Sequence, residues 1–295
     1  MPSSTEKLKS IKNKQKRQQL FAKYKDEQNK KKHKIRAARA KEELQNPELK
    51  AKRLATNVPN TIENMRVYDE TVNTELEGED DFAEYFTNRE KEPKILITTS
   101  PHAKKAAYRF SSTLMEIIPN SSFVKRKREY SMKDMSEYCS NRDFTHLIVI
   151  NEDKKVVNGI TFIHLPQGPT FYFSISSLRD RKQIVGHGNP TEHIPELILN
   201  NFTTRLGQTV GRLFQSLLPH KPEIQGRQVI TLHNQRDYIF FRMHRYVFKN
   251  EEKVGLQELG PQFTLKLRRV QRGIKEEIDW EHRPDMDKEK RKFYL

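Results

Sequence analysis

The chain of 295 residues has one cysteine, one tryptophan and no long hydrophobic run. A single cysteine, Cys139, excludes an intramolecular disulfide and any zinc site built from several cysteines. Apolar runs such as Leu147–Ile150 are far shorter than the ~20 residues that a transmembrane helix needs. The segment Met1–Ser10 lacks the apolar stretch of a secretory signal. We therefore expect an intracellular protein in a reducing compartment.

The sequence also lacks the motifs of common catalytic sites. It has no Walker A motif, no glycine-rich dinucleotide fingerprint after a strand and no HExxH motif. His187 and His193 have no third ligand near them, so no metal site is predicted. Cys139 has no recognisable oriented base, and no pair of carboxylates is placed to hold magnesium. We expect a protein that is not an enzyme and that binds no cofactor and no metal.

Positive charge is what the chain has in excess. Its 55 Lys and Arg residues against 39 Asp and Glu residues give a formal net charge of +16. Residues 1–60 hold 18 basic and 6 acidic side chains, whereas residues 61–92 hold 3 basic and 11 acidic ones. A basic excess of this size favours a polyanionic partner, although acidic membranes and acidic proteins also attract basic chains.

Residues 1–60 are predicted to form a basic, exposed helical arm. Their many Lys, Arg, Gln, Glu and Ala residues favour a helix, but the sparse apolar residues form no stripe that could face a core. The densest basic run is typical of a nuclear-import signal or a nucleic-acid contact, and a solvated tail is the alternative. This run contains Lys30, Lys31, Lys32, Lys34 and Arg36. Residues 61–92 are predicted to be an acidic linker.

Hydrophobic periodicity predicts an ordered α/β domain over residues 93–273 and a charged tail over residues 274–295. The predicted strands lie at residues 94–98, 122–128, 145–150, 159–165, 170–176, 228–232, 238–248 and 263–270. The predicted helices lie at residues 101–118, 131–138 and 195–218.

Capping residues and glycines refine these helices. Ser100 is expected to cap the first helix, and Ser131, with Asp134 three residues further on, is expected to cap the second. On the third helix, Gly207 and Gly211 are expected to allow close packing of the helix against a sheet.

Two parts of the domain repeat at a spacing of 92 residues. Thr145–Ile150 aligns with Asp237–Arg242, and Gly168–Ile175 aligns with Gly260–Leu267. The apolar helix ends at residues 117–119 and 217–219 precede the two units. The repeat predicts two similar α/β halves packed as one domain.

The segment Gly260–Gly273 holds the main candidate site. Phe263, Leu265 and Leu267 alternate with polar or basic residues, which predicts a half-buried strand with an apolar face and a cationic face. Its cations are Lys266, Arg268, Arg269 and Arg272. They either bind RNA phosphates or merely solvate an edge strand and protect it from aggregation. The matching strand at residues 170–176 has almost no positive charge, which favours phosphate binding because the strand can be built without cations.

Other basic residues are predicted to contribute to RNA binding. Arg205 and Arg212, two turns apart on a predicted helix, are expected to extend the cationic surface. A second contact is expected from Lys125, Arg126, Lys127 and Arg128, on a predicted edge strand. Phosphate contacts position a protein without reading sequence, so RNA shape and neighbouring proteins would supply the specificity.

Several segments resemble the hallmark motifs of the Brix family. They are Ile163–Thr170, Leu199–Gly207 and Gly260–Gly273, with Lys94–Ser100 and Asp143–Val149 at the positions of the opening strands. The resemblance covers about residues 92–273 and departs from the family at Thr98–His102, where the arginine that often follows the serine is absent. It implies two α/β halves similar to the anticodon-binding domain of class II aminoacyl-tRNA synthetases. It also implies an RNA-binding segment, similar to one in sigma factors, at Gly260–Arg272.

The resemblance further implies a non-enzymatic factor of ribosome assembly that works in the nucleus and nucleolus beside one dedicated partner protein. We expect an rRNA-binding factor of large (60S) subunit biogenesis and pre-rRNA processing. Its partners would be pre-rRNA, ribosomal proteins and other assembly factors, and no membrane. The alternative is a protein–protein adaptor, in which exposed strands or Phe171–Phe173 contact a partner and only the basic arm touches RNA.

Overall fold

The structure, a computed structural model of the whole chain, describes residues 11–59, 61, 64–67, 82, 92–250, 253–274, 280–282 and 292–295. The chain divides into two compact units, Met1–Met65 and Arg66–Leu295. The second unit holds every strand of the described chain.

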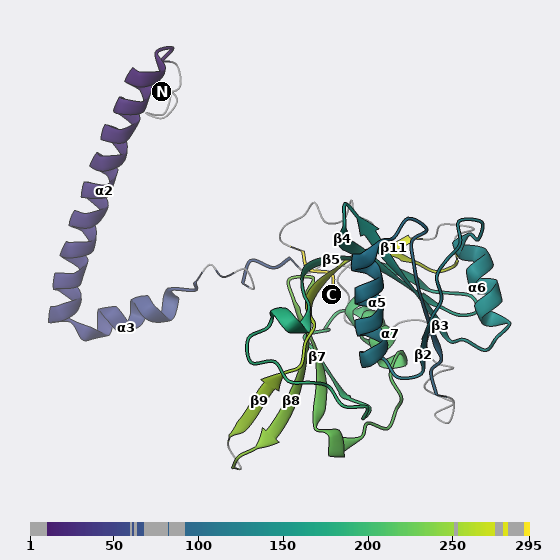
Figure 1. Cartoon of the computed structure of the whole chain (residues 1–295). Helices are drawn as coiled ribbons and strands as arrows, with labels where there is room; N and C mark the ends of the chain where they lie inside the picture. The colour runs from purple at the N-terminus through teal and green to yellow at the C-terminus, as the bar shows by residue number, and fades with distance from the viewer. Residues whose placement is uncertain are drawn as a thin grey trace. The chain divides into compact units, whose positions relative to one another are not determined.

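The first unit is a helical arm composed of α2 (Lys14–Gln45) and α3 (Pro47–Thr56) (Figure 1). Neither helix has a buried residue, which confirms the predicted exposed helical arm. Asn13 caps α2, because its side-chain oxygen accepts the N–H of Lys16 at 3.1 Å. Across the bend between the helices, Arg53 Nε lies 2.5 Å from Glu43 Oε1.

The second unit is built on one mixed sheet (Figure 1). Its helices are α5 (Lys105–Ile117), α6 (Met132–Ser140) and α7 (Arg205–Ser216). Its strands are β1 (Ile95–Thr99), β2 (Ser121–Phe123), β3 (His146–Asp153), β4 (Val156–His164), β5 (Thr170–Arg179), β6 (Glu196–Asn200), β7 (Gln228–Gln235), β8 (Tyr238–Phe248), β9 (Val254–Glu258), β10 (Gln262–Gln271) and β11 (Trp280–His282). The strand order is β2-β1-β3-β4-β5-β10-β8-β7-β6, with β9 paired to β8 and β11 paired to β10.

The two halves of the sheet follow the same order of elements. In the first half, β1 is parallel to β3, and β3, β4 and β5 follow one another antiparallel. In the second half, β6 is parallel to β7, and β7, β8 and β10 follow one another antiparallel. Helix α5 follows β1, and helix α7 follows β6. The prediction of two similar α/β halves in one domain is confirmed.

One of the two alignments between the halves is wrong. Thr145–Ile150 leads into β3, and Asp237–Arg242 leads into β8. However, β3 and β7 are the strands that pair with a parallel neighbour, so β3 corresponds to β7. The antiparallel strands that follow them are β4 and β8, so β8 corresponds to β4. Short apolar strands resemble one another in sequence, and only their neighbours in the sheet identify them.

The second alignment holds where the halves meet, at the antiparallel pair of β5 and β10. Both strands are entered through a glycine with positive φ, Gly168 (107°) and Gly260 (62°). Ser174 pairs with Lys266, which is its own counterpart 92 residues away. The flanking positions pair reciprocally, Phe173 with Leu267 and Ile175 with Leu265. A pseudo-twofold axis therefore passes through the pair of Ser174 and Lys266.

The predicted helix over residues 195–218 is wrong in its first part, because residues 196–200 form strand β6. Asn201 has a left-handed backbone with φ of 63°, which turns the chain after this strand. Thr204 then caps α7, since its Oγ1 accepts the N–H of Gly207 at 2.9 Å. Apolar residues spaced two to four apart are compatible with a strand and with a helix, so periodicity alone did not distinguish β6 from the start of a helix.

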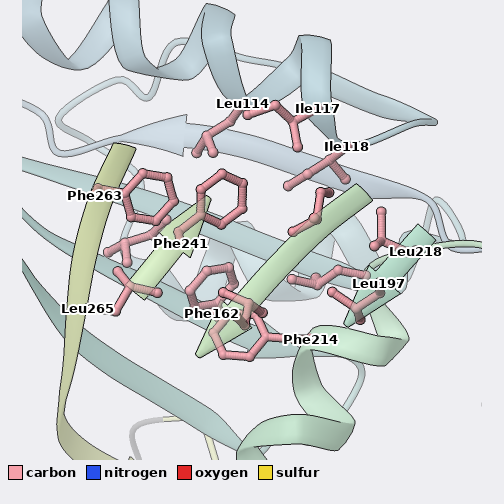
Figure 2. Close-up of a pocket in the computed structure, with 14 residues that line it drawn as sticks. Leu114, Ile117, Ile118, Phe162, Leu197, Phe214, Leu218, Phe241, Phe263 and Leu265 are labelled. Carbon is pink, nitrogen blue, oxygen red and sulfur yellow. The ribbon is translucent and has the colours of Figure 1, made fainter. Parts of the chain in front are cut away.

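Helices α5 and α7 pack on the same face of the sheet, which we call the inner face, and form the main core with it. An apolar cavity of about 50 Å³ lies in this core, lined by residues that include Leu114, Phe162, Phe214, Phe241 and Phe263 (Figure 2). Helix α6 packs on the opposite, outer face, over β1, β3 and β4. Within the described ranges, no helix covers the outer face of β5, β10 and β8.

The last described segment, residues 292–295, packs against the start of α7. Asp237 Oδ1 accepts the N–H groups of Tyr294 and Leu295 at 2.7 and 2.9 Å. A Cβ on Gly207 would lie 2.8 Å from the carbonyl carbon of Leu295. Gly207 therefore admits this segment rather than the predicted sheet, whereas Gly211 faces a side chain of β6 as expected.

Candidate nucleic-acid interface

Strand β10 lies at the centre of the sheet and is not an edge strand. It pairs with β5 along one side and with β8 along the other. On the side of β8, the pairs run from Phe263 to Lys266, and β11 pairs with Val270 and Gln271 further along. Because β10 has a neighbouring strand on each side, its cations are not needed to protect an open sheet edge from aggregation. The interpretation of Lys266 and its neighbours as guards of an edge strand is wrong.

The apolar face of β10 is part of the core, as predicted. Phe263, Leu265 and Leu267 are 4%, 1% and 2% exposed. The Phe263 ring stacks on Phe241 with 4.3 Å between centroids, and it meets Phe110 edge-on at 5.5 Å. These contacts fix which side of β10 faces the helices, and consequently which side faces outward.

A β-bulge places two consecutive arginines on the outer side of β10. The register shifts between Leu267, which pairs with Phe173, and Arg269, which pairs with Tyr172. Strict alternation would point Arg268 outward and Arg269 into the core. The extra residue at the bulge instead lets both arginines face outward and returns Val270 to the core, where it is 0% exposed.

The outward side chains of β10 and its neighbours form a mixed cationic and aromatic surface, which we call the β10 surface. It comprises Tyr172 and Ser174 of β5, Lys266, Arg268 and Arg269 of β10, and Tyr238, Phe240 and Arg242 of β8. Arg268 Nε donates a hydrogen bond to Ser174 Oγ at 3.0 Å. Arg269 is exposed, and Lys266 and Arg268 are partly exposed. Three positive charges thus lie side by side on one strand.

Arg272, the fourth predicted cation of this segment, follows β10 and is exposed. Its backbone lies against Gly168 at the entrance to β5, where a Cβ would come within 2.5 Å of the Arg272 carbonyl oxygen. Arg272 therefore lies beyond the end of the strand that carries the other three cations.

The structure does not bring Arg205 and Arg212 onto the β10 surface. Both residues belong to α7, which packs on the inner face, whereas Lys266 and Arg268 point from the outer face. The prediction that these two arginines extend the same surface is wrong. The sequence of residues 195–218 indicated a helix but did not indicate which face of the sheet the helix covers.

The second predicted basic group, Lys125–Arg128, lies in the loop after β2, at the edge of the sheet. Five strand intervals separate β2 from β10, which corresponds to roughly 24 Å. Arg126 turns inward: its Nε donates to the Tyr130 carbonyl at 2.9 Å, and burial lowers the pKa of its guanidinium. Lys125 Nζ lies 6.0 Å from the Tyr108 ring centroid, and Arg128 Nη2 lies 3.4 Å from His102 Nδ1.

The third predicted basic group lies on helix α2 of the first unit. Lys30, Lys31, Lys32, Lys34 and Arg36 are all exposed. Lys30 Nζ pairs with Asp26 Oδ2 at 3.0 Å, one turn earlier on the same helix. The group belongs to a different unit from the β10 surface.

The groups considered for catalysis are buried or bonded locally. Cys139 is 2% exposed, and burial raises the pKa of its thiol to about 11, so the thiolate is scarce at neutral pH. His146 is fully buried, and its Nε2 lies 3.1 Å from His164 Nδ1 and 2.9 Å from Ser216 Oγ. Burial, reinforced by the neighbouring His164, lowers the pKa of His146 well below its usual value.

The described ranges contain no group of three side chains that could hold a metal ion. The Nδ1 atom of His187 lies 2.8 Å from the Ile184 carbonyl oxygen, and that of His193 lies 3.0 Å from Thr191 Oγ1. Both histidines are therefore bonded within their own loop. None of the described helices has the length and apolar character that a membrane crossing requires.

Sequence reasoning did not place aromatic residues beside the cations of β10, although it named Phe171–Phe173 for contact with a protein partner. Phe171 and Phe173, proposed for contact with a partner, are both 0% exposed and belong to the core, so only Tyr172 between them faces outward. On β8, Tyr238, Phe240 and Arg242 share one side by simple alternation. The alternation along β8 can be seen in the sequence. It indicates an aromatic contribution to the β10 surface only when the pairing of β8 with β10 is known.

Comparison with known proteins agrees with this architecture. Residues 100–269 match the Brix domain. Ribosome production factor 1 of Saccharomyces cerevisiae is 66% identical over 288 residues, which cover 97% of this chain and 98% of the relative. Ribosome production factor 1 of Mus musculus is 51% identical over 301 residues, covering 98% of this chain and 85% of the relative. A Brix domain-containing protein of Schizosaccharomyces pombe is 48% identical over 303 residues, which cover 97% of this chain and 99% of the relative. The chain therefore belongs to the Brix-domain family of ribosome assembly factors.

Proposed function

We propose that this protein is a non-enzymatic, rRNA-binding factor in the biogenesis of the large (60S) ribosomal subunit. Its family and its similarity to proteins named ribosome production factor 1 support a role in ribosome biogenesis. The β10 surface and the basic arm would be its two main contacts with pre-rRNA. A role in pre-rRNA processing and a location in the nucleus and nucleolus follow from the same proposal, with ribosomal proteins, other assembly factors and one dedicated protein as partners.

The observation that carries the RNA-binding proposal is the placement of Lys266, Arg268 and Arg269. A strand in the middle of a sheet gains nothing from three adjacent like charges, which repel one another across the pleats. The equivalent strand β5 is built without them and pairs equally well. The bulge that turns Arg269 outward concentrates the charge further. Such a cluster is suited to the closely spaced phosphates of a nucleic acid.

Crosslinking of the full-length protein to pre-rRNA, followed by mapping of the adducts on both molecules, tests this proposal. We expect protein adducts on β10 and on the neighbouring positions of β5 and β8, in addition to adducts on the arm. We expect RNA adducts within the large-subunit sequences. Adducts confined to residues 1–60 would contradict a role of the β10 surface and would favour the adaptor.

The adaptor function is supported by a different feature, the ribbon formed by the end of β8 and by β9. Four apolar side chains of this ribbon are exposed: Phe248 (68%), Leu256 (64%), Val254 (48%) and Val247 (44%). Phe248 and Val254 are cross-strand neighbours, and Leu256 lies on the same side of the ribbon. Exposed apolar side chains gathered in this way are typical of protein contacts. Substituting Phe248→Ser with Leu256→Ser should release a protein partner in co-purification and leave RNA binding unchanged; release of RNA instead would exclude the adaptor role of this ribbon.

A further inference from the structure

Aromatic rings flank the cations of the β10 surface on both sides. Tyr172 of β5 lies opposite Arg269, and Tyr238 of β8 lies opposite Lys266. Phe240 stands two residues further along β8 and shares the side of Tyr238. Because neighbouring strands lie about 4.8 Å apart, the Tyr172 ring and the two rings of β8 are separated by roughly 10 Å across the strands, with the cations of β10 between them.

Each tyrosine ring is held in place by its surroundings. The Tyr172 ring lies across Gly159 of β4, where a Cβ would be 2.8 Å from Tyr172 Cε2. The guanidinium carbon of Arg269 lies 6.0 Å from the centroid of the same ring. On the other side, Lys266 Nζ lies 5.2 Å from the Tyr238 centroid. The rings are thus oriented by a glycine and by cations before any ligand arrives, which lowers the entropy lost on binding.

The rings remain accessible although they are held. Tyr238 is 43% exposed, and Tyr172 and Phe240 are partly exposed. Their side of the sheet carries no helix within the described ranges. Because these rings are partly exposed, a sheet surface of this kind can receive several planar groups side by side.

Rings and cations together distinguish between two classes of RNA. In a duplex the bases are stacked on one another, and proteins contact mainly phosphates and 2′-hydroxyl groups, so aromatic side chains find no base to stack on. Unpaired bases stack on Tyr and Phe rings while Lys and Arg bind the phosphates beside them. Cations alone would serve both classes, whereas the aromatic rings are useful only for unpaired bases.

We infer that the β10 surface binds a single-stranded segment of rRNA, with bases stacked on Tyr172 and Tyr238 and phosphates held by Lys266, Arg268 and Arg269. This inference rests on the proposed rRNA-binding function and specifies the class of RNA. Phe240 offers a further stacking position on β8. The segment would run across the strands, from β5 over β10 to β8.

The test compares two probes of equal length with the full chain. The first is an unstructured single-stranded RNA, and the second is the same RNA annealed to its complement, each labelled for fluorescence anisotropy. The arm is unchanged in every variant, so its contribution to binding is the same when variants are compared on one probe. We expect the Tyr172→Ala, Tyr238→Ala variant to lose affinity for the single strand by roughly tenfold per ring, and to keep its affinity for the duplex.

Two matched variants separate stacking from folding and from charge. Tyr172→Phe with Tyr238→Phe keeps both rings and should bind the single strand as the unmodified protein does. Gly159→Ala displaces the Tyr172 ring without removing it and should weaken single-strand binding alone. The salt dependence of binding should stay the same in all three variants, because no phosphate contact is removed.

The outcomes distinguish this inference from the proposed function on which it rests. If the alanine variant loses no affinity, or loses equally for both probes, the single-strand inference is overturned. If substitution of Lys266, Arg268 and Arg269 by Gln still weakens binding in that case, the rRNA-binding proposal stands without it. If neither set of substitutions changes binding, both proposals are overturned.

Discussion

The three cations of β10 make a quantitative prediction for the salt dependence of RNA binding. Lys266, Arg268 and Arg269 lie on the outer side of one strand, where each can neutralise one phosphate. Each neutralised phosphate of a single strand contributes about 0.7 to the slope of log K against log salt. The variant Lys266→Gln, Arg268→Gln, Arg269→Gln should therefore show a slope that is smaller by about two.

This change in slope is large enough to measure. When salt rises from 50 to 200 mM, a slope larger by about two means that the unmodified protein loses roughly 20-fold more affinity than the variant does. The assay is a series of anisotropy titrations at five salt concentrations, with thermal melting to show that the variant is folded. The side chains replaced are at the surface, so we expect the melting temperature to change little.

A matched control removes the same charge elsewhere. Lys154, Lys155 and Lys221 are exposed and lie outside every predicted site, so their substitution by Gln should leave the slope almost unchanged. A separate Arg205→Gln, Arg212→Gln variant reports whether α7 makes a contact of its own on the inner side. An equal change of slope in the Lys154, Lys155, Lys221 variant would refute the reasoning, because the effect would then reflect net charge and not the β10 surface.

Three further predictions concern buried groups. The pKa of His146 is lower in the folded than in the unfolded protein, so the unfolded state takes up the proton first as pH falls below 6.5. Stability in denaturant titrations should therefore fall as the pH is lowered from 7, and His146→Gln should flatten this dependence. Cys139, with its pKa raised to about 11, should react with a thiol reagent at pH 8 only after unfolding; rapid labelling of the native protein would contradict its burial. Phe263→Ala should cost about 3–5 kcal/mol in unfolding free energy, because the ring packs between Phe241 and Phe110; a loss under about 1 kcal/mol would mean that the core closes over the gap.

The predictions that held were those that depend on neighbouring residues in the sequence. Ser131 and Asp134 form the expected capping box at the start of α6, with hydrogen bonds of 3.2 and 2.7 Å. The alternation of Phe263, Leu265 and Leu267 correctly gave β10 its apolar side. These features need only the local chain, so periodicity and capping rules are sufficient to find them.

The predictions that failed depend on distant residues. Ser100 does not cap α5; Glu152 does, since its Oε2 accepts the N–H groups of Lys104 and Ala107 at 2.8 and 2.9 Å from a strand about 45 residues away. The central position of β10 likewise follows from its pairing with β5, some 90 residues upstream. The bulge that turns Arg269 outward is a property of that pairing and leaves no signal in β10 alone.

The seam between β5 and β10 has a consequence for the asymmetry of the molecule. Two identical strands paired antiparallel about an axis are what a symmetric dimer forms at an isologous contact, where each residue meets its own copy. At the axis of such a dimer, a lysine would face a second lysine at the same height, and the two charges would repel. Here the position on the axis is occupied by Lys266 on one strand and by Ser174 on the other. Because both halves belong to one chain, only one of the two positions on the axis carries a charge. The surface is therefore asymmetric about this axis, as a surface formed by two identical subunits could not be.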